Sequence, residues 1–430
     1  MKYLSKTFVS ALAFVSVMSM TTVQASAQDL GFNIPDKETV EAQKKARDNK
    51  AASQSIGRAI MDAFELYEEE QIKEAIAVLE EQEPDPGYDS AYLGRFLGNL
   101  YAADERMADA LRVLKSSVDQ DVLGWSDQAA AMKLVGQISL QEEKYDQSIE
   151  YLRKWVQFTG EKDPKVFLYM ANAYYQKKEF AQIIPFAEAA LEYGEPDKNV
   201  YTLMMASYYE RKMYSDAIGV LEEGLNKLPE VTQWWPQLAQ FYMLEENLAK
   251  ALQTIEVAYL AGYLDKESQF KMLVQLYDNE GIPYKAATTM EKHVEAGDIE
   301  QTAKNFATIA NSYHRAKTLD KAVEWYLRAA EAAEDADDKG EYYRKRGNIM
   351  LLNEQYIAAA EPLKKALDYL DGRDEGRVYM SLAEAYFYGG DYRQAMRYVN
   401  EAAKFDGQRR SARSWKGYIQ STAKRKGIEL

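Results

Sequence analysis

Small residues recur along this chain in a register that is typical of packed helices. A first position, mostly occupied by Ala or Gly, is followed twelve residues later by a second, and successive pairs are offset by 34 to 38 residues. We call these two positions the small slots. The ten pairs are Ala63 and Ala75, Gly98 and Ala110, Gly136 and Ser148, Ala171 and Ile183, Met205 and Ala217, Ala239 and Ala251, Val274 and Ala286, Ala310 and Ala322, Gly347 and Ala359, and Ala383 and Ala395.

Aromatic residues occupy fixed places beside the first small slot. Four residues before it stand Phe167, Tyr201, Trp235, Phe270, Phe306, Tyr343 and Tyr379, and three residues after it stand Tyr101, Tyr174, Tyr208, Tyr242, Tyr277, Tyr313 and Tyr386. These spacings place the rings on one helical stripe, where they fill the space beside the small residues. The pattern therefore predicts ten hairpins of two closely packed helices, with the aromatic residues in the core.

The repeat resembles the tetratricopeptide repeat (TPR), whose signature has an aromatic residue, a small residue, Tyr, Ala, an apolar residue, Ala and Pro in that order. The segments YTLMMASYYERKMYSDAIGVLEEGLNKLP and VYMSLAEAYFYGGDYRQAMRYVNEAAKFD carry the resemblance best. It implies an all-α fold, a right-handed TPR superhelix (α-solenoid) of about ten helix-turn-helix repeats with a C-terminal capping helix. It also implies a role in binding other proteins.

Four segments follow from this reading. Residues 1–27 have the pattern of a signal peptide, with Lys2 and Lys6 before an apolar run and a small-residue cleavage site ending at Ala27. Residues 28–54 are polar and form a flexible lead-in with at most one weakly formed helix, and the repeats occupy 55–407. Residues 408–430 form a basic capping helix and tail. The protein is expected to be exported and soluble, with no transmembrane anchor after cleavage.

The charge of the chain narrows the kinds of partner. The formal net charge is -15, and this acidic surface argues against nucleic acid as a ligand. The exception is a cluster of Lys and Arg residues near the C-terminus, at positions 409 to 426. This cluster has two readings: a solvated, helix-ending tail, or a docking patch for an acidic partner or an anionic membrane surface.

No constellation of residues indicates an enzyme. The chain has no cysteine and only two histidines, His293 and His314, neither of which stands in a metal-binding motif. His293 occupies a slot between helices and His314 follows a core tyrosine. We therefore expect no catalytic residue, no metal, no cofactor and no small-molecule substrate.

Amide side chains recur one position after the first small slot, where the resemblance places the concave face of the solenoid. They are Asn99, Gln137, Asn172, Gln240, Gln275, Asn311 and Asn348. An amide both donates and accepts hydrogen bonds, which suits the backbone of an extended peptide. Two basic pairs, Arg95 with Lys133 and Arg344 with Arg377, resemble parts of the TPR clamp that binds a C-terminal carboxylate. The other reading is a merely hydrophilic face.

The combination of signal peptide and acidic repeat array also resembles the periplasmic TPR proteins that accompany TonB, ExbB and ExbD systems in Gram-negative bacteria. The resemblance implies a periplasmic protein-protein interaction scaffold, an accessory of TonB-dependent outer-membrane transport whose partners are envelope proteins. The alternative is a scaffold or adaptor for outer-membrane or cell-wall assembly.

Overall fold

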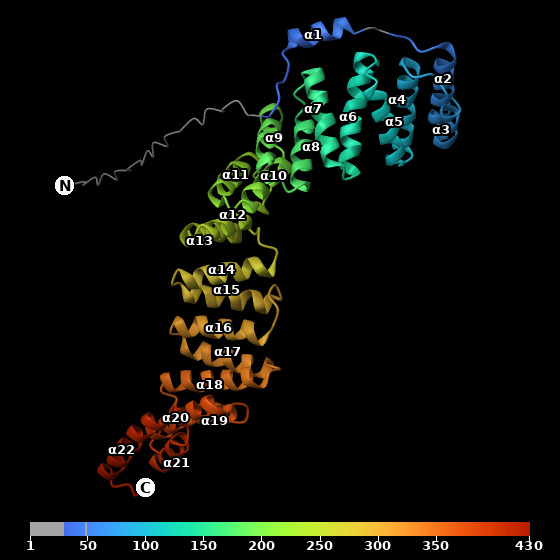
Figure 1. Ribbon diagram of the computed structural model, residues 1–430. Helices are drawn as coiled ribbons and strands as arrows, with labels where there is room; N and C mark the ends of the chain where they lie inside the picture. Colours follow the sequence, from blue (N-terminus) through green and yellow to red (C-terminus); the bar gives the residue numbers. More distant parts are fainter. Residues whose placement is uncertain (1–29, 48–49) are drawn as a thin grey trace, which may run out of the picture. The chain divides into compact units, whose positions relative to one another are not determined.

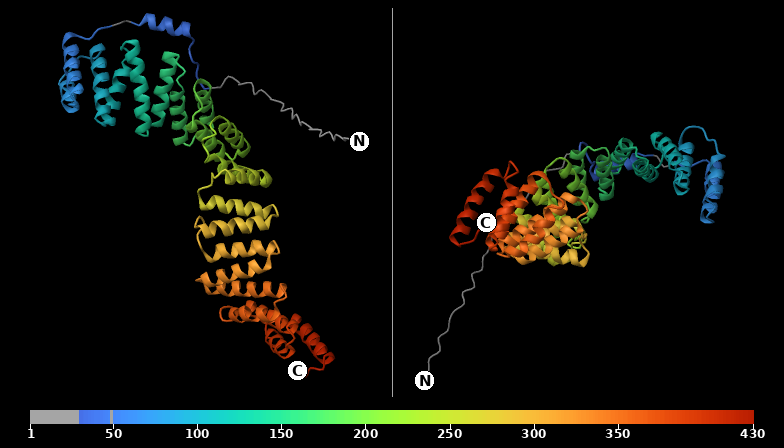
Figure 2. Two further views of the ribbon diagram at one scale, coloured as in Figure 1. Left: turned by 180° about the vertical axis from the view of Figure 1, so that it is seen from behind. Right: turned by 90° about the horizontal axis from the view of Figure 1, so that it is seen from below.

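A computed structural model describes residues 30–47 and 50–430, and within these ranges the regular structure consists of 22 α-helices without a strand (Figures 1 and 2). The segment expected to be a signal peptide, residues 1–27, lies outside them. The chain divides into two compact units, unit 1 (Met1–Ser207) and unit 2 (Tyr208–Leu430). None of the helices in the described ranges combines the length and apolar character needed to cross a membrane.

The helices of unit 1 are short and regular. They are α1 (Lys37–Ala46), α2 (Gln54–Glu68), α3 (Ile72–Glu80), α4 (Tyr88–Ala103), α5 (Met107–Asp119), α6 (Trp125–Gln141), α7 (Tyr145–Thr159), α8 (Pro164–Gln176) and α9 (Phe180–Tyr193). The boundary between the units falls within α10 (Lys198–Glu210).

Unit 2 continues the same alternation of first and second helices. It contains α11 (Tyr214–Lys227), α12 (Trp234–Leu244), α13 (Leu248–Leu260), α14 (Glu267–Asn279), α15 (Pro283–Ala296), α16 (Ala303–Arg315), α17 (Leu319–Ala332), α18 (Ala336–Leu352), α19 (Tyr356–Ala366), α20 (Gly372–Tyr388), α21 (Tyr392–Ala402) and α22 (Arg409–Arg425).

Neighbouring helices pack in sequence order inside each unit. α2 packs on α3, α3 on α4 and so on to α9, and the same succession runs from α11 to α22. In chain order, α2 to α21 make ten helix-turn-helix segments, and α22 follows as a single terminal helix. The prediction of an all-α solenoid of about ten repeats with a C-terminal helix is confirmed.

The small slots lie where helices approach one another most closely. Every one of them is buried except Met205, which is half-buried. A Cβ atom added to Gly98 would lie 2.3 Å from Leu114 Cγ, and one added to Gly136 would lie 2.6 Å from Leu152 Cγ. The predicted register is confirmed, and its cause is that the first helix of a repeat leaves no room for a larger side chain against the second helix.

Each hairpin turns on one residue in the left-handed backbone region. This residue stands seven positions after the first small slot in every repeat: Glu70, Glu105, Glu143, Lys178, Lys212, Glu246, Gly281, Lys317, Glu354 and Gly390. The next N–H donates to a carbonyl five residues earlier, as in the 2.8 Å bond from Gln71 N to Leu66 O. This is the Schellman arrangement that ends a helix, and it fixes the tight turn between the two helices of a repeat.

The segment before the repeats is attached to unit 1 by specific contacts. The lead-in expected over residues 28–54 contains α1 in its described part, and Arg47, directly after α1, donates from Nε to Leu123 O at 2.6 Å. The guanidinium also pairs with Asp121 at 2.9 Å. Before α1, the ring of Phe32 stacks on Phe186, with 6.4 Å between their centroids. These contacts join the lead-in to the α5–α6 loop and to α9.

Helix α22 completes the core of the last repeat. Ala412, Ile419 and Ala423 are buried in one cluster with Ala395 and Val399 of α21. The opposite side of α22 is exposed and polar, as a capping helix requires for solubility.

Candidate peptide-binding surface

The seven predicted amides all lie on first helices and all reach the surface. In unit 1, Asn99 is exposed, and Gln137 and Asn172 are half-buried. In unit 2, the side chains of Gln240, Gln275 and Asn311 are exposed and that of Asn348 is half-buried. We call the side of unit 1 formed by α2, α4, α6 and α8 the first-helix face of unit 1. A row of amides on this face stays a prediction, which the geometry below refines.

A pocket of about 220 Å³ opens beside Asn99 between α2 and α4. Its lining is apolar apart from that amide and the hydroxyl of a tyrosine: Ile60, Ala63, Phe64, Tyr67, Leu79, Phe96, Asn99 and Leu100. Phe64 and Tyr67 remain 55% and 43% exposed, large fractions for aromatic side chains that line a pocket. The first two repeats therefore form an apolar pocket with one amide at its edge.

A second pocket, of about 380 Å³, opens beside Gln137. It is lined from α4 to α8 by Ala102, Met107, Leu134, Gln137, Ile138, Leu140, Gln141 and Tyr169. Again apolar side chains predominate and amides supply the polar groups. Two successive amides of the predicted row thus border two successive apolar pockets of unit 1.

The apolar lining was missed at the sequence level, although the sequence contains a signal for it. Two residues before the first small slot, unit 1 carries Met61, Phe96, Leu134, Tyr169 and Leu203. Phe96, Leu134 and Tyr169 stand one helical turn before the amides Asn99, Gln137 and Asn172. The same position in the later repeats is occupied by Gln237, Met272, Thr308, Lys345 and Ser381. In unit 2 only Met272, which precedes Gln275, is apolar at this position, so the combination of an amide with an apolar side chain is concentrated in unit 1.

The two candidate carboxylate clamps are occupied by the protein's own acids. In unit 1, Arg95 Nη2 lies 3.0 Å from Asp127 Oδ1, and its side chain is 19% exposed. Lys133 Nζ lies 2.5 Å from Asp163 Oδ2, and the pKa of that carboxyl is lowered from its ordinary value despite its burial, since Lys133 and the backbone of Lys165 hydrogen-bond to it.

The second clamp is closed in the same way. Both Nε and Nη2 of Arg344 donate to Glu341 at 2.6 Å, and Arg377 Nη1 donates to Asp374 at 2.7 Å. A peptide carboxylate would have to displace these acids, so the geometry favours the amides and pockets over the clamps.

One amide of the row, Asn311, accepts a hydrogen bond from a buried side chain. The hydroxyl of Tyr326, a residue buried in α17, donates to Asn311 Oδ1. Replacing Asn311 with an apolar residue would leave this hydroxyl without its acceptor, which destabilises the fold. Asn311 is therefore a poor position at which to test binding.

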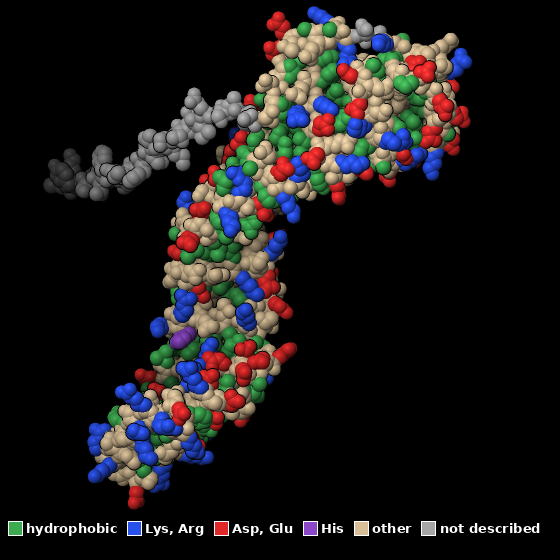
Figure 3. Space-filling model, viewed as in Figure 1, with side chains coloured by type: hydrophobic (Ala, Val, Ile, Leu, Met, Phe, Trp, Pro, Cys, Tyr) green, Lys and Arg blue, Asp and Glu red, His purple; other side chains and the backbone are tan. Residues whose placement is uncertain are grey.

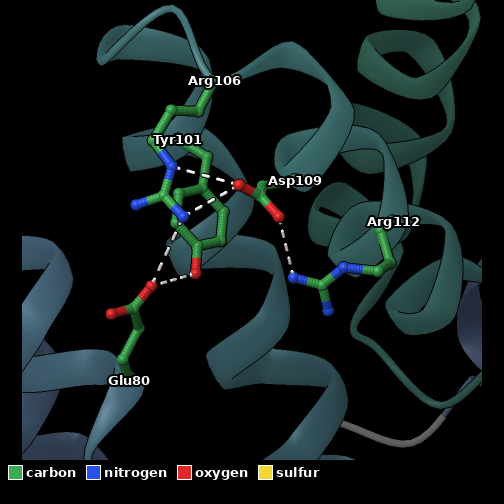
Figure 4. A network of polar contacts seen from close by, with 5 residues as sticks. All are labelled: Glu80, Tyr101, Arg106, Asp109 and Arg112. Carbon is green, nitrogen blue, oxygen red and sulfur yellow. Dashed lines mark hydrogen bonds and ion pairs between the residues drawn. The ribbon is translucent and has the colours of Figure 1, made fainter.

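The tyrosines three residues after the small slot do more than fill the core. Tyr101 donates its hydroxyl to Glu80 of the preceding repeat at 2.5 Å, and Arg106, whose side chain also pairs with Asp109, lies over the same ring (Figure 4). Three further pairs have the same arrangement: Tyr242 with Glu222, Tyr277 with Glu256, and Tyr313 with Glu291. Each of these four bonds ties the first helix of a repeat to the second helix of the repeat before it.

This arrangement raises the pKa of the phenols. Burial, and then the hydrogen bond to Glu80, raise the pKa of Tyr101 to about 12, and the same two causes raise that of Tyr242 to about 12. The tyrosines are therefore hydrogen-bond donors to carboxylates and serve the fold.

The two histidines lie apart from any cluster of metal ligands. His293 is buried, with Nδ1 2.7 Å from Asp298 Oδ2 and Nε2 3.0 Å from the hydroxyl of Tyr259. Burial and then Lys317 lower the pKa of His314. Over residues 30–47 and 50–430 there is no group of three or more His, Cys, Asp or Glu residues placed to hold a metal ion.

Comparison with known proteins finds similarity only among solved structures. No family model matches the sequence, and no curated protein matches it. The C-terminal part of a TPR repeat-containing protein from Cytophaga hutchinsonii is 13% identical over 65% of this chain and 97% of that one, with a TM-score of 0.37.

Two further structures show the same level of similarity. A tetratricopeptide repeat protein from Parabacteroides merdae is 11% identical over 67% of this chain and 98% of that one, with a TM-score of 0.36. YrrB, described as a TPR protein with an unusual peptide-binding site, is 18% identical over 44% of this chain and 90% of that one, with a TM-score of 0.34. The fold described above rests on the helices and contacts of this chain itself.

Proposed function

We propose that this chain is a non-enzymatic scaffold that binds an extended segment of a partner protein on the first-helix face of unit 1. The observation that carries the proposal is the coincidence of two predicted amides, Asn99 and Gln137, with two apolar pockets. An extended segment turns alternate side chains to the same side, so it presents apolar anchors and backbone groups together.

The two kinds of group on this face have different tasks. Burying one Leu- or Phe-sized anchor in a pocket contributes roughly 1.5 to 3 kcal/mol, which supplies affinity. An amide hydrogen bond to the peptide backbone adds about 1 kcal/mol and fixes the register without selecting a side chain. Since Arg95 and Lys133 already pair with acids, the partner segment is recognised by apolar side chains rather than by charge.

Photo-crosslinking tests where the partner lies. Benzoylphenylalanine placed at Asn99 or Gln137 should give one crosslinked product in envelope extract. The same residue at Lys73 of α3 or Gln182 of α9, exposed positions on second helices, should give none of that product. Crosslinks of equal yield from both sets would show that the partner does not occupy the first-helix face.

The finer part of the proposal concerns the partner and the compartment. The signal-peptide pattern and the resemblance of the sequence to periplasmic TPR proteins support an accessory of a TonB-dependent outer-membrane transport system. Mass spectrometry of the crosslinked product distinguishes this from the alternative, because a TonB-, ExbB- or ExbD-type component supports the transport role. An outer-membrane or cell-wall assembly protein supports the alternative instead.

Export is tested separately from binding. The exported form should begin near Gln28, directly after the small-residue site that ends at Ala27. An exported chain that retains residues 1–27 would contradict the signal-peptide assignment and would leave the binding surface on unit 1 as the remaining claim.

A further inference from the structure

The solvent side of α22 carries cations without acids. Residues 409–426 contain seven Lys or Arg residues and no Asp or Glu, in a chain whose net charge is -15. Figure 3 shows Lys and Arg side chains gathered at the C-terminal end of the molecule. This local reversal of charge stands out in an acidic protein, and it is unrelated to the first-helix face of unit 1.

The packing of α22 fixes which side chains reach solvent. Ala412, Ile419 and Ala423 are buried against the last repeat. At 100° per residue, Arg410, Arg413 and Lys424 lie together on the opposite side of the helix, and all three are exposed. Lys416 is also exposed and lies about 60° around the helix from Arg413, toward the packed side.

These cations are free to meet a partner. Among the ion pairs of the part of the chain that the structure describes, Arg409 pairs with Asp406, and none includes Arg410, Arg413, Lys416 or Lys424. We call these four residues the α22 cation set.

Helix stability explains only part of this charge. Lys424 and Arg425 in the last turn interact favourably with the helix dipole, as in a solvated, helix-ending tail. Arg410 lies in the first turn, which contains no acidic residue, and there a cation opposes the dipole by about 0.3 to 1 kcal/mol. The positive charge at the start of α22 therefore acts against helix stability, which points to a binding role.

Exposed aromatic rings lie at the other edge of the solvent side of α22, where Tyr418 is about 120° or more around the helix from Arg413 and Lys424. Tyr418 and Tyr388 are each 50% exposed, and both contact the half-buried Trp415, with ring centroids 6.1 Å and 6.3 Å away. Tyr and Trp side chains with one apolar and one polar end are favoured at the boundary between lipid headgroups and acyl chains. A lipid surface uses both the cations and the rings.

We propose that α22 docks the chain on the surface of an anionic lipid membrane. The cations attract the negative surface, each contributing about 1 kcal/mol, and the tyrosines enter the headgroup layer. The helix lies on the membrane and does not cross it. Docking by α22 leaves the first-helix face of unit 1 as a separate site, so the two proposals stand or fall independently.

Vesicle co-sedimentation of the full chain tests this proposal. Binding to vesicles of phosphatidylglycerol and phosphatidylcholine should be strong at low salt, should weaken as salt rises, and should be absent with phosphatidylcholine alone. Replacing all four residues of the α22 cation set with Gln should lower the partition coefficient by about a hundredfold or more.

A matched variant controls for net charge. Lys73, Lys198, Lys227 and Lys304 are exposed lysines on other helices, and changing them to Gln removes the same charge, so binding should stay within about twofold. Equal loss in both variants would overturn the proposal, as would binding to neutral vesicles. Failure of the full chain to bind anionic vesicles would also overturn the proposal. If the full chain bound polyglutamate instead, an acidic protein partner would be favoured.

Discussion

Three glycines of unit 2 lie in three different environments, so that a Gly→Ala substitution meets a different constraint at each. Gly219 lies in the exposed interior of α11, and Gly281 stands at a hairpin turn with a φ of +73°; a Cβ atom at either would have no neighbour within 4 Å. Gly347 occupies a small slot, where a Cβ atom would lie 2.5 Å from Leu363 Cγ. At Gly219 and Gly281 the backbone conformation determines the effect of an added side chain, and at Gly347 packing determines it.

Replacing each of these glycines with Ala should therefore give different results. Gly219→Ala should stabilise the protein by about 0.5 to 1 kcal/mol, since Ala restricts the unfolded chain and suits a helix. Gly281→Ala should destabilise it by about 1 kcal/mol through left-handed strain, and Gly347→Ala by about 1 to 3 kcal/mol through overpacking. Urea denaturation measures all three, and a single sign for the set would show that the repeat register is misplaced.

The hydroxyl of Tyr242 should make stability depend on pH in the alkaline range. Its pKa is raised from 10.0 to about 12 by burial and by the bond to Glu222. The folded state holds this proton more tightly than the unfolded state, so the stabilisation is complete below pH 10 and is lost as the pH rises through about 12.

Tyr242→Phe removes both the bond and the titrating group. At neutral pH the variant should be less stable by about 1 kcal/mol, and the difference from wild type should shrink above pH 10. Tyr209→Phe, at a tyrosine that is 47% exposed, is the matched control. A Tyr242 difference that stays constant with pH would contradict the assigned hydrogen bond.

For single residues, the sequence predicted burial better than it predicted hydrogen-bond partners. The spacing of the small and aromatic positions placed Tyr101 and Tyr242 correctly in the core. Their carboxylate partners lie 21 and 20 residues earlier, on the second helix of the preceding repeat. No periodic pattern within one helix specifies such a pair, because it depends on how two repeats pack.

Among the elements, the hairpins were predicted from the sequence, whereas the contacts that attach α1 to unit 1 were not. Each hairpin depends on the spacing of small and aromatic residues within its own two helices. Because this spacing recurs ten times, the sequence predicts the hairpins. The attachment of α1 depends on single residues, chiefly Arg47 and Phe32, whose contacts lie 74 to 154 residues away in the chain. A polar segment with two such anchors has no apolar stripe, which is why it was read as flexible.

Arg47→Ala should release α1 from unit 1. The change removes the bond to Leu123 O, the ion pair with Asp121 and the contact of the guanidinium with Phe158, 5.1 Å from its ring centroid. Hydrogen exchange in 37–46 should accelerate by about tenfold or more, as expected for losing roughly 1.5 to 3 kcal/mol of charged hydrogen bonding. Lys44→Ala, on α1 but exposed, should leave the exchange unchanged, and equal exchange in both variants would contradict the docking.

For the whole molecule, the repeat pattern in the sequence predicted the fold, but it predicted only part of the candidate binding site. The register runs through all ten repeats without a gap, so nothing in it foretold the division into two units; its one departure from full burial is Met205, close to the boundary. The amide row was visible in the sequence. The apolar pockets beside Asn99 and Gln137 required the structure, because their lining comes from helices of successive repeats.

The central claim is that a partner segment binds on the first-helix face of unit 1. Its most direct test uses one peptide, selected on the wild-type chain from a random library of extended peptides. The affinity of this peptide is measured for the wild type and for two double variants. In the first variant Asn99 and Gln137 of unit 1 become Leu, and in the second Gln240 and Gln275 of unit 2 become Leu. Losing two net hydrogen bonds should weaken binding about tenfold or more in the first, while the second binds as the wild type does. Equal affinities in all three proteins, or a loss confined to the second variant, would contradict binding on the first-helix face of unit 1.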